Sequence, residues 1–364
     1  MSAPRFMAGS DALAAAMVAA GCRFFAGYPM TPFTGVLEAM AQRLPGAGGV
    51  CMNAESELEA IGMCWGAAAI GARAATGSTG QGLALMQESL AEMTSARLPL
   101  VVLNMARGQG DYFQTTRGGG HGDYRLPVLA PVDVSEAVTH VSLAFGWAEA
   151  WRTPVMLFGD YYLAHTHRSV SIPAPEEPVT PAWAVDGRSG GTGRARLISP
   201  LGTVKQRDGQ GAQAGYDLAV HYRACADRTR AMLDGIAPRI EAETGGDTAV
   251  LVVAYGSPAA YVRAAVRELR AEGLPVGYAR PVTLVPFPYG ALARLARGCR
   301  AVAVYENNSG QAVDDVRLAV DGQVPVEFIG GLSMDPSGFG IAPDLDVTHL
   351  KERIMQLVGR VAAR

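Results

Sequence analysis

The sequence predicts an α/β protein built on a doubly wound parallel sheet. Patterns typical of strands and of helices alternate along most of the 364 residues. The run Leu100–Leu103 is continuously apolar, as in a strand that is buried on both faces of a parallel sheet. The 44 glycines suit the tight turns between strands and helices that such a fold requires.

A first domain is expected over residues 1–172. Ser10 and Asp11 are expected to cap its first helix, which would end at Gly21. The run Gly77–Gly82 should open a further helix that continues to about residue 95. The other helices are expected at 12–20, 33–43, 55–70 and 134–150, and the strands at 22–26, 50–52, 74–77, 100–103, 128–130 and 154–158.

Residues 173–245 have the composition of a connection, with prolines first and Gly-rich polar runs later. A helix is expected near its end, over 217–243. A second α/β domain is expected over 246–364, and about 115 residues suffice for a compact unit. Its strands are expected at 248–255, 276–279 and 301–305, and its helices at 258–271 and 310–320.

Composition excludes several classes of function. The formal net charge is −3 and no block of Lys or Arg occurs, which argues against binding to nucleic acid or to an anionic membrane. No apolar run approaches the roughly 18 residues that span a bilayer, and the N-terminus lacks the apolar core of a signal peptide, so a cytoplasmic protein is expected. The five scattered cysteines form no C-x-x-C pair and offer no local ligand set for zinc or an iron–sulfur cluster. Electrons leaving an active site here would need another polypeptide.

The turn Gly27–Pro32 follows a short apolar strand. Gly27 allows a sharp change of direction, and the two prolines stiffen the turn. Tyr28 and Thr31 are therefore expected at the carboxyl end of a strand, where ligands bind in open α/β sheets. A proline-rich strand-to-helix turn with no further role would show the same six residues.

Three glutamates open the helix expected at 55–70. Glu55 and Glu59 share one face at a spacing of four residues, and Glu57 points away from them. Carboxylates there could simply be solvated groups that match the helix dipole. The glycines of Gly77–Gly82 could cradle an anion, although the run has neither a P-loop ending nor a dinucleotide fingerprint, so close packing of helix on strand is the default expectation.

Arg107 directly follows a buried strand and has glycines around it. A planar guanidinium at that place could bind a carboxylate, and an ordinary surface arginine is the alternative. The segment Thr115–Tyr124 contains three consecutive glycines and then His121-Gly-Asp123, which favours an irregular, site-forming loop. No third ligand accompanies His121 and Asp123 in the sequence, so no metal site is predicted.

Six segments together resemble the alpha chain of 2-oxoacid:ferredoxin oxidoreductases, most of all the branched-chain (2-oxoisovalerate) type. The resemblance covers nearly the whole chain, and two of the segments are long enough to be specific. The segments are Tyr28–Pro32, the Glu-x-Glu that begins at Glu55, Asp111–Leu126, Trp183–Gly187, Arg280–Pro288 and Glu306–Gln311. In the family a longer Gly/Pro-rich insertion usually follows the equivalent of Arg107, so a short substrate-side loop is expected here.

The resemblance implies a thiamine diphosphate enzyme. The first domain would bind the pyrimidine, and the second would resemble the transketolase C-terminal domain and be structural. Glu57 resembles the glutamate that hydrogen-bonds N1′ of the aminopyrimidine, Thr31 the threonine beside the substrate oxygens, and Arg107 the arginine that holds the substrate carboxylate. Cofactor contacts are thus expected from Tyr28, Pro29, Glu57 and Thr79, and substrate contacts from Thr31, Arg107 and His121.

The expected activity is oxidative decarboxylation of a 2-oxoacid with CoA to acyl-CoA, CO2 and reduced ferredoxin. Thiamine enzymes hold the diphosphate and Mg²⁺ with a Gly-Asp-Gly and a later Asn, and no Gly-Asp-Gly occurs in this sequence. A beta subunit would therefore carry that half of the site, and gamma or iron–sulfur subunits would carry the clusters. Two alternatives remain: a subunit of a non-redox thiamine-dependent 2-oxoacid decarboxylase, and a non-catalytic scaffold subunit.

Overall fold

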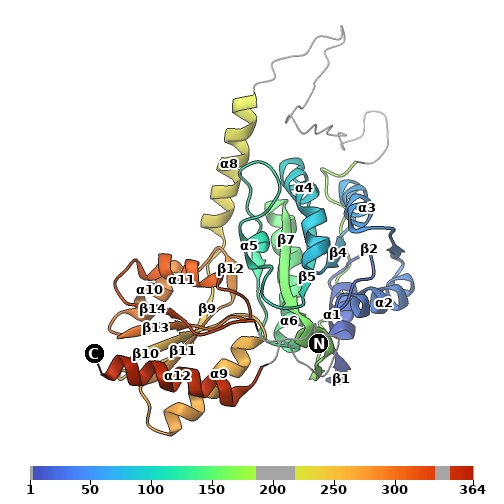
Figure 1. Cartoon of the computed structure of the whole chain (residues 1–364). Helices are drawn as coiled ribbons and strands as arrows, with labels where there is room; N and C mark the ends of the chain where they lie inside the picture. Colours follow the sequence, from blue (N-terminus) through green and yellow to red (C-terminus); the bar gives the residue numbers. More distant parts are fainter. Residues whose placement is uncertain (1–2, 186–217, 333–344, 364) are drawn as a thin grey trace.

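The computed structural model describes residues 3–185, 218–332 and 345–363, arranged around two main sheets (Figure 1). The larger sheet has seven strands in the order β12-β6-β7-β5-β4-β2-β3, and all its neighbours are parallel except β12 and β6. Its strands are β2 (Phe24–Gly27), β3 (Val50–Asn53), β4 (Ala74–Ser78), β5 (Leu100–Ala106), β6 (Val128–Leu129), β7 (Pro154–Asp160) and β12 (Thr283–Val285). The predicted α/β class is confirmed.

Helices cover both faces of this sheet and bury two apolar clusters against it. On one face lie α1 (Gly9–Ala19), α2 (Thr34–Arg43) and α6 (Val134–Trp151). On the other lie α3 (Glu57–Ala69) and α4 (Gly80–Ala96). Strands β4, β5 and β7 are buried along their whole length, which explains the apolar runs of β5 and β7. Outside this layer are β1 (Arg5–Ala8) with β8 (His167–Val170), the short helices α5 (Tyr112–Thr116) and α7 (Tyr161–His165), and the 3-10 turn η1 (Pro45–Ala47).

The second sheet has five strands in the order β14-β13-β10-β11-β9, in which β9 alone is antiparallel to its neighbour. Its strands are β9 (Ile240–Glu243), β10 (Val250–Val253), β11 (Val276–Pro281), β13 (Ala301–Val304) and β14 (Val326–Phe328). Two apolar clusters flank it, one with α9 (Pro258–Ala271) and α12 (Val347–Ala362), the other with α10 (Tyr289–Ala296) and α11 (Ala312–Val320).

Four local expectations were wrong. The first helix begins at Gly9 and is not capped by Ser10, whose hydroxyl donates to the Ala164 carbonyl at 3.0 Å. The helix expected from Glu55 begins at Glu57, because Ser56 adopts the extended N-cap conformation. Residues 112–116, partly inside the expected loop, form α5. The helix expected over 217–243 is α8 (Leu218–Gly235), and the chain then enters strand β9.

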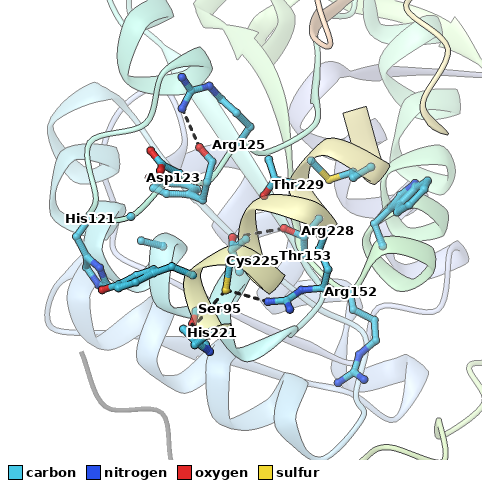
Figure 2. Close-up of a pocket in the computed structure, with 17 residues that line it drawn as sticks. Ser95, His121, Asp123, Arg125, Arg152, Thr153, His221, Cys225, Arg228 and Thr229 are labelled. Carbon is cyan, nitrogen blue, oxygen red and sulfur yellow. Dashed lines mark hydrogen bonds between the residues drawn. The ribbon is translucent and has the colours of Figure 1, made fainter. Parts of the chain in front are cut away.

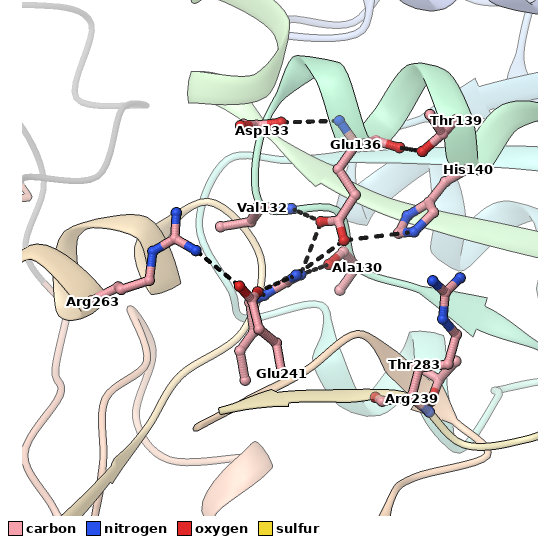
Figure 3. A network of polar contacts seen from close by, with 11 residues as sticks. Ala130, Val132, Asp133, Glu136, Thr139, His140, Arg239, Glu241, Arg263 and Thr283 are labelled. Carbon is pink, nitrogen blue, oxygen red and sulfur yellow. Dashed lines mark hydrogen bonds and ion pairs between the residues drawn. The ribbon is translucent and has the colours of Figure 1, made fainter. Parts of the chain in front are cut away.

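The two parts of the chain are joined by a shared sheet and a buried ion network. Strand β12 lies between β11 and α10 in sequence, yet it pairs with β6 of the first sheet. Arg280, 3% exposed, donates to both oxygens of Glu136 on α6 at 2.9 and 3.0 Å and to Glu241 on β9 at 2.7 Å. Figure 3 shows the two labelled acceptors, Glu136 and Glu241, facing each other across this network. The segment Arg280–Pro288 therefore works as the junction. Residues 186–217, the middle part of the expected connection over 173–245, lie outside the described part of the chain.

Candidate active site

The predicted site residues follow neighbouring strands of the first sheet. Tyr28 comes directly after β2, Thr79 after β4 and Arg107 after β5, and Glu57 starts the helix after β3. The pairs β2–β3, β2–β4 and β4–β5 are parallel, so the carboxyl ends of these strands share one edge of the sheet. The structure therefore brings these four residues to the edge where open α/β sheets bind ligands.

Glu57 is the buried carboxylate of this edge, with only 2% of its surface exposed. Its Oε1 accepts a hydrogen bond of 2.7 Å from the Ser78 hydroxyl, and no described residue hydrogen-bonds to Oε2. Glu59, on the first turn of α3, and Glu55, which precedes the N-cap Ser56, are both exposed. Burying a carboxylate costs free energy unless its oxygens accept hydrogen bonds. Because Oε2 of Glu57 has no such partner among the described residues, the site is suited to a ligand that carries a hydrogen-bond donor.

The turn after β2 contacts the ends of β4 and β5. Arg107 Nε donates to the Thr31 carbonyl at 3.1 Å, and the Thr79 hydroxyl lies 2.9 Å from the Met30 sulfur. The terminal nitrogens of Arg107 make no hydrogen bond or ion pair with the described residues. Thr31 is exposed and Arg107 half-buried, so both can reach a small ligand at this edge.

Glycines allow the close approach of the elements that form the site. A Cβ on Gly82 would overlap both the Glu57 carboxylate and the Ser78 hydroxyl, and one on Gly80 would overlap the Asp111 carboxylate. A Cβ on Gly77 would overlap the backbone of β5. The expected close packing of helix on strand is confirmed, and it places the start of α4 against Glu57.

Sequence reasoning missed two polar residues at this edge. Oδ1 of Asn104 and Oδ2 of Asp111 are buried and accept no hydrogen bond from the described residues. Burial raises the pKa of Asp111, and its neighbours Asn104 and Gln114 offset part of that rise. A signal was present, because Asn104 interrupts the apolar strand β5 and Asp111 begins the most characteristic segment of the sequence.

His121 is not brought to this group. Its Nε2 lies 2.7 Å from Oε1 of Glu92. Glu92 follows Gly80, the first residue of α4, by twelve residues, so the two are about 18 Å apart along the helix axis. There it lines a pocket together with His221, Cys225 and other residues of α8 (Figure 2). The substrate contact expected from His121 stays a prediction that the geometry of the single chain does not support.

The donor set fits the pyrimidine part of thiamine diphosphate and does not suit a metal. A buried glutamate with a free oxygen can accept from a protonated ring nitrogen, and the absence of a side chain at Gly82 lets its carboxylate lie against the start of α4. No group of three or more His, Cys, Asp or Glu residues in the described part of the chain could hold a metal ion.

Among the helices of residues 3–185, 218–332 and 345–363, none has the length and apolar character needed to cross a bilayer.

Two protein-family models match this chain, one over most of the first sheet and one over most of the second. Residues 15–188 match the family model described as pyruvate flavodoxin/ferredoxin oxidoreductase, thiamine diphosphate-binding, and residues 248–336 match the core domain II of pyruvate:ferredoxin oxidoreductase. The ketoisovalerate oxidoreductase subunit VorB of Methanothermobacter thermautotrophicus is 34% identical over 87% of this chain and 90% of its own length. The 2-oxoglutarate synthase subunit KorA of the same organism is 33% identical over 90% of this chain and 94% of its own.

Solved structures agree. The 2-oxoglutarate:ferredoxin oxidoreductase of Magnetococcus marinus, solved with 2-oxoglutarate, coenzyme A and succinyl-CoA bound, superposes with a TM-score of 0.78 at 26% identity, over 98% of this chain and 66% of that one. A split-gene transketolase shares the fold alone, with a TM-score of 0.58 at 15% identity. The chain belongs to the family of alpha-type subunits of 2-oxoacid:ferredoxin oxidoreductases, enzymes assembled from several subunits.

Proposed function

We propose that this chain supplies the pyrimidine side of a thiamine diphosphate site in a 2-oxoacid:ferredoxin oxidoreductase complex. The observation that carries the proposal is Glu57, a buried carboxylate at the ligand-binding edge of a thiamine diphosphate-binding domain, with one oxygen free of described partners. When bound, the cofactor supplies the electron sink for loss of CO2 from a 2-oxoacid.

In this proposal Glu57 holds a proton at N1′ of the aminopyrimidine. The Ser78 hydroxyl fixes the orientation of the carboxylate through Oε1, so that Oε2 is presented to the ring nitrogen. Exclusion of water around a residue that is 2% exposed strengthens this contact. Thr79 and the turn residues Tyr28 and Pro29 would line the same side of the ring.

Arg107 binds the substrate carboxylate in this proposal. Its Nε is already occupied by the Thr31 carbonyl, which orients the guanidinium and leaves the terminal nitrogens for the ligand. A planar fork of this kind matches the geometry of a carboxylate. Thr31 lies beside Arg107 and would contact the oxygens of the 2-oxoacid.

A beta-type partner would contribute the diphosphate and Mg²⁺ half of the site. Large apolar side chains are exposed on the N-terminal halves of α3 and α4 and on α5, elements that border the proposed cofactor position: Leu58, Met63, Leu85 and Phe113. A contiguous apolar surface on these neighbouring elements would be typical of a face that another chain covers. Gamma or iron–sulfur subunits would carry the electrons onward to ferredoxin, because this sequence has no local cluster ligands.

The proposed reaction is oxidative decarboxylation of a 2-oxoacid with CoA, giving acyl-CoA, CO2 and reduced ferredoxin. Relatives named for ketoisovalerate and for 2-oxoglutarate match this chain to a similar degree, and the Magnetococcus marinus structure contains 2-oxoglutarate and coenzyme A. These names support the 2-oxoacid class. Assays with different 2-oxoacids would identify the side chain of the substrate.

The test is to tag this chain in its native host, purify it with its partners and measure 2-oxoacid- and CoA-dependent viologen reduction. Both 2-oxoisovalerate and 2-oxoglutarate should be assayed, and iron should be determined in the same sample. Viologen reduction together with iron supports the proposal. Decarboxylation without iron or viologen reduction would make the chain part of a non-redox decarboxylase, and full activity in a Glu57→Gln complex would make it a scaffold.

A further inference from the structure

We propose that the second domain positions the arginine that binds the substrate. Residues of the second domain hold the loop 108–117, which follows Arg107 directly, and Gln311 at the start of α11 is the central positioning residue. This inference rests on the proposed role of Arg107 and adds a function to a domain expected to be structural.

Gln109 is bound by the second domain through all four of its polar groups. Its backbone N–H donates to the Asn307 carbonyl at 3.0 Å, and its Oε1 accepts from the Asn307 N–H at 2.7 Å. Its Nε2 donates to the Tyr255 carbonyl at 3.0 Å, and its carbonyl accepts from Asn308 Nδ2 at 2.9 Å. Gln109 lies two residues after Arg107, so the chain between them can span only about 7 Å.

Gln311 bridges two points of the same loop. Its Nε2 donates to the Gly110 carbonyl at 2.8 Å, and its Oε1 accepts from the Phe113 N–H at 2.8 Å. One side-chain amide therefore satisfies a carbonyl and an N–H on either side of Asp111. Loops need such partners for their backbone groups, and here the partner comes from the other domain.

Asp315 holds the far end of the loop. Its side chain is completely buried and accepts hydrogen bonds from the Tyr112 hydroxyl at 2.5 Å and from Arg117 at 2.9 Å. The Tyr289 hydroxyl of α10 donates to the same carboxylate at 2.5 Å. Burial is the main reason for the raised pKa of Tyr112, and the carboxylate of Asp315 adds to it.

The second domain offers these groups on a rigid support. Glu306, fully buried after β13, accepts hydrogen bonds from the backbone N–H groups of Gln311, Ala312 and Val313 at 2.8 to 3.0 Å. The first turn of α11 is thereby fixed to the end of β13. A shift of α11 would move the loop, and with it the guanidinium of Arg107.

The experiment uses the purified complex and compares Gln311→Ala with Asp314→Ala. Asp314 is the matched control, because it lies exposed on the first turn of α11 and its carboxylate pairs with Arg317 of the same helix. In Gln311→Ala the KM for the 2-oxoacid should rise about tenfold, because a misplaced binding group is costly. The turnover number and the KM for CoA should stay within about twofold, and Asp314→Ala should change none of these quantities.

Hydrogen exchange gives a readout that does not depend on turnover. The amide of Phe113 loses its acceptor in Gln311→Ala, so peptides spanning 107–117 should exchange faster in that complex than in Asp314→Ala. Asp315→Asn, which keeps the shape of the side chain, should produce the same two effects. Unchanged exchange together with unchanged KM in both variants overturns the inference.

A double variant separates this inference from the function on which it rests. If Gln311 acts through Arg107, then Gln311→Ala should not raise the KM further when Arg107→Ala is already present. Independent, additive effects would overturn the inference and leave the role of Arg107 intact. An unchanged KM in Arg107→Ala alone would overturn the proposed substrate contact, and this inference with it.

Discussion

The hydroxyl of Ser78 donates a 2.7 Å hydrogen bond to Oε1 of Glu57, and both side chains are buried. The bond joins the last residue of β4 to the first residue of α3. It exists only because Gly82 has no side chain in the space that these two groups occupy. The orientation of the buried carboxylate is therefore determined by three separate elements.

Glu57→Gln should lower turnover by at least about a hundredfold with a small change in KM. The reason is that a neutral amide cannot stabilise the positive charge of a protonated ring nitrogen as a carboxylate does. Steady-state kinetics of the complex, with thiamine diphosphate content measured in parallel, would check this. Glu59→Gln is the control, since Glu59 is exposed on the same turn. A larger loss in the control would show that the role of Glu57 belongs to its neighbour.

Arg107→Ala should raise the KM for the 2-oxoacid, because a charge-assisted contact worth about 1.5–3 kcal/mol is lost. Cofactor content should be unchanged, since Glu57 and its bond to Ser78 are untouched. Titration of several 2-oxoacids against the variant complex measures the effect. An apparent affinity equal to that of the wild type for every active substrate would contradict the assignment.

The isolated chain should not bind thiamine diphosphate with Mg²⁺ in the micromolar range. Much of the binding free energy of this ligand lies in its charged diphosphate and metal, and the described residues contain no metal-binding cluster. Calorimetry of the chain alone is the measurement, with the purified complex as the positive control. Micromolar binding without a partner would place the diphosphate site in this chain.

Stability should fall as the pH drops from about 6.5 to about 4, and His140 should account for part of the fall. Burial lowers the pKa of His140 to about 4, with Arg239 and Arg280 acting in the same direction and Glu136 opposing them. Between pH 6.5 and pH 4 the imidazole of His140 is protonated in the unfolded chain and neutral in the folded chain. Acid therefore lowers the free energy of unfolding, by up to about 3 kcal/mol from this residue.

Denaturant unfolding of the wild type and of His140→Gln at pH 7 and pH 4.5 measures this contribution. The variant should lose less stability between the two pH values. His349→Gln is the control, because His349 is exposed. Burial raises the pKa of Glu136, but the hydrogen bonds and the charge of Arg280 outweigh burial, so the pKa is lowered overall. Glu136 should therefore still contribute to the acid sensitivity of both variants. Equal losses in wild type and His140→Gln would contradict the prediction.

Patterns that repeat locally were predictable from the sequence. The apolar run Leu100–Leu103 lies inside β5, the helix expected at 258–271 is α9 at the same residues, and on the first turn of α3 Glu57 is buried while Glu59 is exposed. Each of these follows from a period of two or 3.6 residues and from burial on one face or two. The grouping of site residues at one sheet edge followed from the parallel order of the strands.

Features that depend on partners distant in sequence were not predictable. Residues 240–243 continue a helical pattern, but pairing with β11 makes them a strand. Ser10 is a residue type favoured at N-caps, yet its hydroxyl donates a hydrogen bond to the carbonyl of Ala164, 154 residues away. The binding of Gln109 by Asn307 and Asn308 is likewise set by the docking of two sheets. No local period encodes such contacts.

The place of β12 affects how this chain can be recombined with its relatives. Thr283 and Val285 lie beyond the start of the second sheet in sequence but complete the edge of the first through Leu129 and Val128. A chimera that exchanges residues 246–364 would also exchange an outer strand of the cofactor-binding half. The two halves are thus not interchangeable modules, and a productive hybrid must preserve the fit between β12 and β6 as well as the fold of each part.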